Sequence, residues 1–266
     1  MNGCKSTARN FPLGQRDMPT SEAVSAAEML YGDLVVLRQK DPTNKDLLEN
    51  RVHGGMHLIG LYVRSGNLEK AQGIFDQLGE VVSESQQQEE LREIRAGAAV
   101  NLAIGYGDAG FIDRVQAIYD DVKKTAEEFP NQPDLRDSQA RIAANMGIDY
   151  LKRGQIDAVI EISDELKELA EAHPTETNLA REQVRLLAML VFYYTDDDPD
   201  IKRARELYHI IVEASQRRPE DPFIRKAQAD TAVSIIAKID DLAGCGKSRS
   251  VLPPAQLVGF CTFVTR

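Results

Sequence analysis

The sequence predicts an all-α fold in which about ten helices stack as a row of repeats. Three observations predict it. Tyrosines recur at intervals of 44 residues, each is followed four residues later by glycine or aspartate, and apolar residues between these turns recur at helical spacing. The tyrosines are Tyr62, Tyr106, Tyr150 and Tyr194. A fixed period of this length indicates helical units that stack on one another rather than one enlarged core.

The composition argues against several classes of function. The chain of 266 residues has 42% hydrophobic and 28% charged residues, which is normal for a globular protein. It has no tryptophan and 6% aromatic residues, so we expect no aromatic ligand cage. The net charge of −10 argues against a nucleic-acid partner, because proteins of that class gather positive charge on one face.

Cysteine usage and the absence of long apolar runs indicate the compartment. Cys4, Cys245 and Cys261 lie outside the periodic part, and an odd number at the two ends forms no disulfide framework. No stretch reaches the ~18 apolar residues of a membrane span, and residues 1–17 hold no signal-peptide core. We therefore expect a cytoplasmic protein without a membrane partner.

The chain divides into three parts. Residues 1–19 are polar, rich in turn-forming residues and without a period, and we interpret them as a flexible leader. Residues 20–241 hold the repeats, and residues 242–266 differ in composition, with an apolar stretch from Val251 to Val264. Val258–Val264 could add a strand to a partner or fold back on the open end of the row. A flexible tail is the interpretation we favour.

The first expected helix, Ser21–Lys40, is half of a repeat. It ends before Pro42, because the residue that precedes a proline is pushed out of helical geometry. Its Leu34 lies 44 residues before Leu78, which belongs to the second helix of the next pair. The row therefore begins with the second half of a repeat.

The next two helices form the first full repeat. Thr43 is placed to cap the first of them, which runs to Tyr62. Gly66 then accepts the left-handed conformation that ends a helix sharply, and the second helix follows. Ser85 and the glutamine three residues later form a capping box that opens the next pair.

Three further pairs and a last helix repeat this order. The pairs hold Leu91–Tyr106 with Ile112–Val122, Ile142–Tyr150 with Ile156–Leu166, and Leu186–Tyr194 with Ile201–Ile211, and the last helix spans Asp221–Asp241. Gly110 and Gly154 repeat the role of Gly66. The fourth turn has Asp198 instead and one extra residue, so the period becomes 45 there. Aspartate accepts the left-handed conformation less readily than glycine, and the extra residue compensates for it.

These residues resemble the tetratricopeptide repeat (TPR) family. Measured from the tyrosine, that family has a large apolar residue four before, glycine four after, a small residue nine after and an aromatic one thirteen after. The first repeat matches throughout, with Leu58, Tyr62, Gly66, Ala71 and Phe75. Later repeats match in part, since Val115 and Val159 replace the small residue and Ser163 replaces the aromatic one. The resemblance implies a right-handed α-solenoid of antiparallel helical hairpins, with a period of 44 instead of the usual ~34.

The resemblance also implies where a partner binds. In TPR proteins the first helix of each pair lines a concave groove that holds an extended or helical peptide. The groove positions of this chain hold Asn101, Asn145, Arg141, Arg185, Arg64, Ile104, Ile148 and Leu151. The amides could bind a peptide backbone and the arginines a carboxylate, with apolar contact between them. The alternative is that they are ordinary surface residues of their helices.

Three features argue against specialised sites. The groove has no lysine six residues before any of the four tyrosines, so the family's usual basic clamp for an acidic tail is not expected. His53 and His57 have a spacing that can bind zinc, but a catalytic zinc motif needs glutamate where Gly54 stands. No nucleophile–base set emerges from the spacing. We expect no metal, no cofactor and no enzymatic activity.

The function that these observations predict is a non-catalytic scaffold or adaptor that binds a protein or peptide. The alternative is a structural protein that self-assembles into a homo-oligomer through its terminal helices, Ser21–Lys40 and Asp221–Asp241. Polar outer faces on these helices favour the monomer, and apolar ones favour assembly. The apolar residues of the last helix are interpreted as forming mostly one face, which favours the monomer. A third interpretation, a regulator that holds a small ligand, requires a closed pocket.

Overall fold

The computed structural model describes residues 18–84 and 89–243, and these residues form an all-α fold, as predicted. They contain ten helices and no strand. The helices are α1 (Ser21–Lys40), α2 (Lys45–Arg64), α3 (Leu68–Glu84), α4 (Glu89–Asp108), α5 (Ile112–Glu128), α6 (Pro133–Lys152), α7 (Ile156–Ala172), α8 (Thr177–Asp196), α9 (Ile201–Arg217) and α10 (Pro222–Leu242). The leader up to residue 17, the capping box at residues 85–88 and the tail from residue 244 lie outside the described part of the chain.

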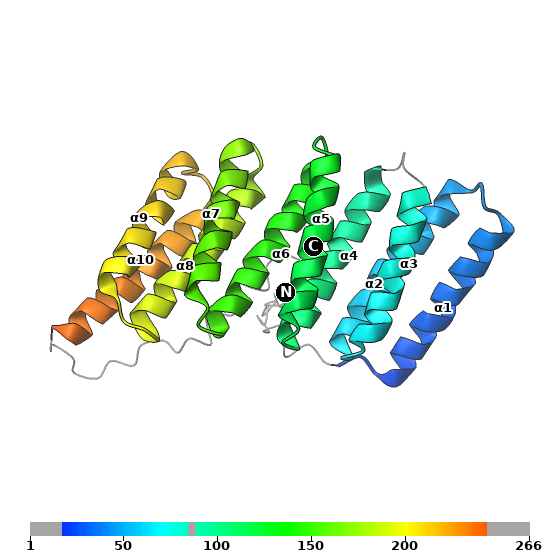
Figure 1. The fold of residues 1–266 in the computed structure, drawn as a ribbon, viewed down its shortest axis with the longest axis horizontal. Coiled ribbons are helices and arrows are strands. Elements are labelled where there is room, and N and C mark those ends of the chain that lie inside the picture. Colours follow the sequence, from blue (N-terminus) through cyan, green and yellow to red (C-terminus); the bar gives the residue numbers. More distant parts are fainter. Residues whose placement is uncertain (1–17, 85–88, 244–266) are drawn as a thin grey trace, which may run out of the picture.

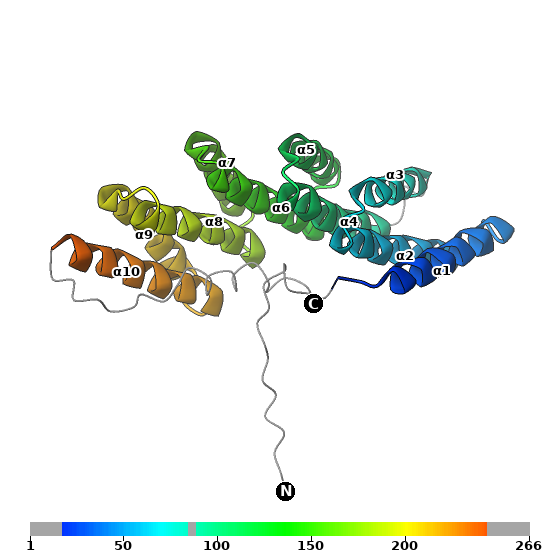
Figure 2. The same ribbon diagram turned by 90° about the horizontal axis from the view of Figure 1, so that it is seen from below.

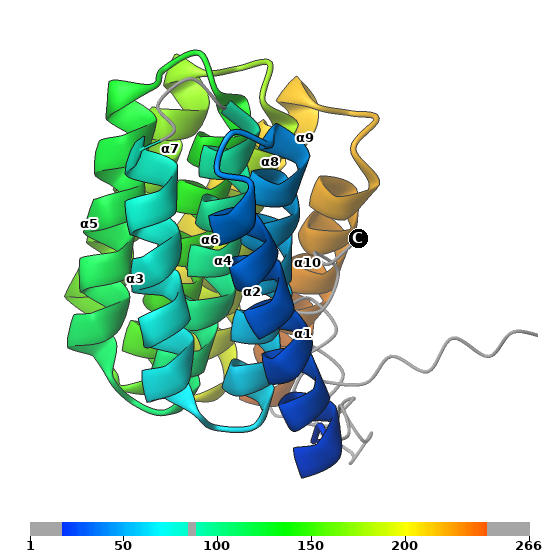
Figure 3. The same cartoon turned by 90° about the vertical axis from the view of Figure 1, so that its right-hand side faces the viewer.

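The helices form a row of two layers (Figure 1). The even-numbered helices α2, α4, α6, α8 and α10 each pack against the next even-numbered helix. The odd-numbered helices α3, α5, α7 and α9 each pack against the two helices that precede and follow them in the chain. Figure 2 shows that the row is curved, with α2, α4, α6 and α8 on the inner side, and Figure 3 shows the two layers from the end that carries α1. We call α2, α4, α6, α8 and α10 the inner helices and the others the outer helices.

Helix lengths explain the 44-residue period. The inner helices α2, α4, α6 and α8 have 20 residues each. The outer helices α3, α5, α7 and α9 have 17 residues each. The remainder of each period is taken by two short connections. None of the helices in the described part is long and apolar enough to cross a bilayer.

Two of the repeated tyrosines, Tyr62 and Tyr106, connect the two layers. Tyr62 and Tyr106 are buried, and each donates its hydroxyl hydrogen to a residue of the preceding outer helix. Tyr62 Oη lies 2.7 Å from Glu28 Oε1, and Tyr106 Oη lies 3.2 Å from Gln72 Oε1. Glu28 and Gln72 occupy the same position of successive repeats. Burial, and then the neighbouring Glu28 carboxylate, raise the pKa of Tyr62 above its ordinary value, so the hydroxyl stays protonated and donates.

The predicted turns are confirmed at the three glycines. Gly66, Gly110 and Gly154 have φ of 75°, 86° and 69°, which is the left-handed region. In each of these turns the amide after the glycine donates to the carbonyl oxygen of the repeat tyrosine. In the fourth turn Asp200 N donates to Tyr194 O, one residue later than in the other repeats, and no residue takes a positive φ. The extra residue therefore replaces the left-handed conformation.

One predicted helix cap is wrong by a residue. Asn44, not Thr43, precedes the first turn of α2, and its side-chain oxygen accepts from Leu47 N at 3.2 Å. Thr43 instead donates its hydroxyl hydrogen to Asp41 Oδ1. Both side chains can cap a helix, and the turn after Pro42 decides which of them reaches the free amides.

Candidate partner-binding surface

The predicted groove residues lie on four inner helices. Arg64 is exposed at the end of α2, Asn101 and Ile104 are half-buried on α4, and Arg141 and Asn145 are half-buried on α6. Ile148 and Leu151, also on α6, are buried in the core and offer little apolar surface to a partner. Arg185 on α8 is 6% exposed. Arg64 and the half-buried groups of α4 and α6 are therefore the accessible part of the predicted surface.

Arg185 holds the contact between two inner helices. Its Nη2 donates to Asn145 Oδ1 of α6 at 3.0 Å, and its Nε donates to Glu182 Oε2 at 2.7 Å. Glu182 is also buried. The arginine that was predicted to hold a partner's carboxylate is thus already bound to a carboxylate of its own helix, and it fixes the orientation of the Asn145 amide.

Charged and amide side chains continue this contact along α6 and α8. We call this set the polar seam, and it consists of Asp137, Arg141, Asn145, Asn178, Glu182 and Arg185. Burial raises the pKa of the Asp137 carboxyl above its ordinary value, the Arg141 charge opposes that shift, and the Glu182 charge adds to it. The seam is therefore a partly desolvated strip in which opposite charges alternate.

Sequence reasoning found half of the polar seam. Arg141, Asn145 and Arg185 were named from the TPR positions, whereas Asp137, Asn178 and Glu182 were not. The signal for Asp137 was present, because it lies four residues before Arg141 and therefore on the same helix face. Asn178 and Glu182 come from another helix, and only the packing of α8 on α6 places them there.

A second set of arginines connects successive inner helices. Arg92 Nε donates to Gln132 Oε1 at 2.7 Å, and Arg181 Nε donates to Asp221 Oδ2 at 2.8 Å. Arg136 binds Glu176 in the same way. Gln132, Glu176 and Asp221 are the residues that precede α6, α8 and α10. These arginines fix the spacing of the inner helices.

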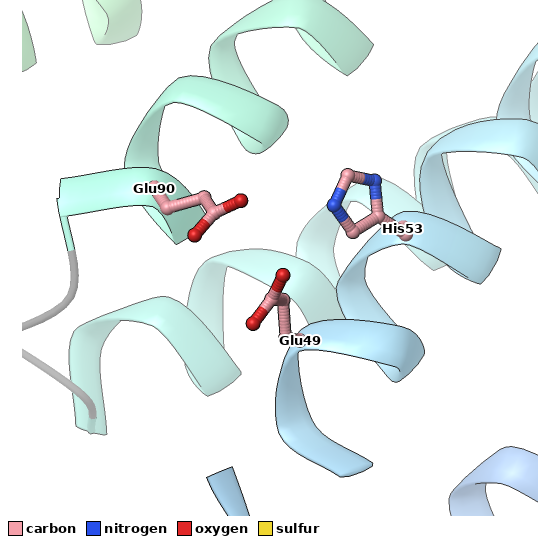
Figure 4. Close-up of side chains that lie close together, drawn as sticks. All are labelled: Glu49, His53 and Glu90. Carbon is pink, nitrogen blue, oxygen red and sulfur yellow. The ribbon is translucent and has the colours of Figure 1, made fainter. Parts of the chain in front are cut away.

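A third cluster joins α2 and α4. Glu49 and His53 lie one turn apart on α2, Glu90 lies in the first turn of α4, and one ligand atom from each falls within 4.8 Å of the others (Figure 4). The repeat position of His53 is occupied by Arg141 in α6 and Arg185 in α8, where the cation faces a carboxylate of the polar seam. His57 is not part of the cluster. One imidazole with two carboxylates is a donor set that suits zinc or manganese. Exposed carboxylates also gather without an ion, so this geometry alone assigns no metal.

A pocket of about 370 Å³ opens between α3, α4 and α5. The Arg95 guanidinium lies in its wall, 4.4 Å from the Phe75 ring centre, and Arg95 Nη1 is 2.8 Å from Asp121 Oδ2. A small ligand there would meet an arginine that is already paired and stacked. The pocket therefore offers weak support for the interpretation of a small-ligand regulator.

The exposed apolar surface gathers at the two ends of the row. Eight of the eleven large apolar side chains that are exposed in the described residues lie on the terminal helices. They are Met29, Leu30, Val36 and Leu37 of α1 and Val233, Ile236, Ile239 and Leu242 of α10. The interpretation of the last helix as mostly one-faced is wrong. Its residues Ile224, Ala227 and Ile235 are buried, while the four exposed apolar residues of α10 face outward.

A scan of protein-family models and searches of curated proteins and of solved structures found no match. The functional argument therefore rests on the surfaces described above.

Proposed function

We propose that the protein is a non-catalytic scaffold or adaptor that binds an extended protein or peptide segment on the inner face of its curved row. The proposal includes the fold that the TPR resemblance implies, a right-handed α-solenoid of antiparallel helical hairpins, and a place in the cytoplasm. The observation that carries it is the continuous row of inner helices, with half-buried polar groups at equivalent positions along it.

The chemistry of these groups suits a peptide backbone. Asn101 and Asn145 occupy the same position of α4 and α6, and each amide can donate and accept a hydrogen bond. Asn145 Oδ1 accepts a hydrogen bond from Arg185. This bond fixes the side chain of Asn145 and therefore the direction in which its amide hydrogens can donate. Ile104 adds an apolar contact between them. The backbone of an extended peptide presents alternating hydrogen-bond donors and acceptors, and amide side chains spaced along the inner face can bind both.

Selection from a random peptide library tests the proposal. Selected peptides are then measured against the triple variant Asn101→Ala, Arg141→Ala, Asn145→Ala. The control is Gln77→Ala, Lys124→Ala, Gln216→Ala, which likewise removes one cation and two amides, but from exposed positions of the outer helices. We expect affinity to fall about tenfold or more for the inner-face variant and to stay unchanged for the control. Peptides that bind both variants as tightly as the wild type would refute the inner face as the binding surface.

Self-association is the second candidate function, and the apolar outer faces of α1 and α10 favour it. A row of repeats whose terminal helices lack a polar outer face tends to associate through its ends. This candidate is compatible with the first, because the ends and the inner face are separate surfaces.

A further inference from the structure

Two of the exposed apolar residues of α10, Val233 and Ile236, occupy repeat positions that are buried elsewhere in the row. Val233 and Ile236 are equivalent to Ala188 and Val191 of α8, and to Val100 and Ala103 of α4. All four of these equivalents are at most 3% exposed. The position of Ile236 is held in α6 by Gly147, where a Cβ atom would lie 2.8 Å from Leu186 Cδ2 of the next inner helix. This face of α10 is therefore built to receive a following repeat.

Two of the exposed apolar residues of α1, Leu30 and Leu37, lie on the side of the helix that would face a preceding repeat. Leu30 is equivalent to Ile118 of α5 and Ile162 of α7, which are 5% and 6% exposed. Leu34, which lies between Leu30 and Leu37 in the helix, packs against Gly54 of α2, whereas Leu30 and Leu37 are 60% and 46% exposed. The residue equivalent to Leu34 in α3 is Leu78, which packs against Gly55 of the preceding inner helix. The open apolar surface of α1 is therefore formed by Leu30 and Leu37, beside the position at which the other outer helices receive a preceding inner helix.

The two ends are complementary halves of one repeat. Within residues 18–243, as far as the structure describes them, the row begins with an outer helix that has no preceding inner helix and ends with an inner helix that has no following outer helix. Figure 1 shows α1 and α10 at opposite ends. We propose that a second copy of this chain covers α10, with its α1 packed on α10 as α9 packs on α8 and its α2 beside α10 as α10 lies beside α8. The contact extends the packing that already connects the repeats.

Such a contact is head-to-tail, so a pair of copies still has one uncovered α1 and one uncovered α10. Assembly through it continues into a filament unless the curvature closes a ring. The proposal rests on the second candidate function, self-association, and names the two surfaces that meet. It does not depend on peptide binding by the inner face. Failure of this contact and failure of peptide binding are therefore separate results.

Complementary blocking of the two ends tests the proposal in the full-length chain. One variant carries Val233→Glu and Ile236→Glu, which places charge on the α10 face, and the other carries Leu30→Glu and Leu37→Glu on the α1 face. Ile210→Glu is the control, because Ile210 is an exposed apolar residue of α9 and belongs to neither of the two terminal helices. Sedimentation velocity over a wide range of concentrations gives the masses, and circular dichroism with thermal melting confirms that each variant is folded.

We expect the wild type and the control to associate with concentration. Each blocked variant alone should associate on the order of a hundredfold more weakly, because the contact would bury unpaired charges. Mixing the two blocked variants should restore association and stop at a 1:1 dimer, since each supplies the end that the other lacks.

Three outcomes would overturn the proposal. A wild type that stays monomeric at every concentration would show that something other than a second copy covers α10, such as the tail from residue 244. Association of one blocked variant with itself would show a symmetric contact through the other end. A mixture that remains monomeric while the wild type associates would exclude pairing of α1 with α10.

Discussion

At the scale of single residues, Tyr106 contributes both a buried ring and a hydrogen bond between layers. We expect Tyr106→Ala to lower the free energy of unfolding by about 3–5 kcal/mol, because truncation of a large buried aromatic side chain leaves a cavity. Tyr106→Phe keeps the ring and loses the bond to Gln72, so its cost should be about 1 kcal/mol. Urea unfolding followed by circular dichroism measures both. Equal losses in the two variants would mean that the hydroxyl, not the ring, holds the layers.

Arg185 differs from Arg141 although both occupy the same repeat position. Its side chain is 7% exposed and paired with a Glu182 side chain that is 8% exposed. Arg185→Ala leaves a buried carboxylate without its partner, and we expect a loss of about 3–5 kcal/mol in unfolding free energy. Adding Glu182→Gln to that variant should recover part of the loss, because it removes the stranded charge.

Arg141→Ala is the comparison for that experiment. Arg141 is half-buried, so its loss should change stability much less than the loss of Arg185. A cost for Arg141→Ala as large as that for Arg185→Ala would assign both arginines to the structure and remove Arg141 from the proposed binding surface.

Asp137 gives stability a pH dependence of defined sign. Its pKa in the folded protein is raised above the ordinary 3.8, chiefly by burial. The folded state therefore binds the proton more tightly than the unfolded state, so this residue's contribution to stability falls as pH rises through the window above 3.8. We expect Asp137→Asn to be more stable than the wild type at neutral pH, with the difference vanishing below that window. Urea unfolding over a pH series measures this difference, and a gap that widens toward acid would contradict the assignment.

At the scale of helices and turns, the order of the elements could be predicted from the sequence, because the local spacing of apolar residues indicates each helix. Helix boundaries follow from Pro42 and from the glycines at 66, 110 and 154, whose conformations are set within a few residues. The placement of Glu182 beside Arg185 and Asn145 is different, because it depends on how far α8 is rotated against α6. Periodicity indicates the apolar face of a helix but not which polar groups meet across two helices.

Two glycines make the role of the turn testable with opposite signs. Gly66 has φ of +75°, and a Cβ there would meet no atom within 4 Å, so Gly66→Ala costs only backbone strain. We expect a loss of about 1–2 kcal/mol. Gly73 lies inside α3, also in open space, and Gly73→Ala should raise stability by about 0.5–1 kcal/mol because glycine is a poor helix former. Thermal or urea unfolding compares them, and effects of the same sign would contradict the assigned conformations.

At the scale of the whole molecule, the ends of the row show what a repeat pattern leaves undetermined. The period identifies α1 and α10 as half-repeats, yet apolar residues at helical spacing look alike whether they face a neighbour or solvent. Val233 and Ile236 became informative only once the structure showed that their equivalents in α8 are covered. Exposed apolar positions whose equivalents are buried in other repeats therefore mark the surfaces that no other described residue covers.

The charges near those ends give the proposed assembly a distinctive salt dependence. With α1 of one copy antiparallel to α10 of another, the proposed packing would bring Arg38 and Lys40 toward Arg225, and Glu22 toward Asp240 and Asp241. Like charges therefore meet at both ends of an apolar contact. Raising the ionic strength from about 0.1 M to 1 M shortens the screening length from about 10 Å to 3 Å, which weakens this repulsion. We expect the association constant of self-association, measured by sedimentation equilibrium, to rise on the order of several-fold, because salt screens the repulsion. Weaker association in salt would show that ion pairs hold the copies together, and the contact would then have to lie elsewhere than between α1 and α10.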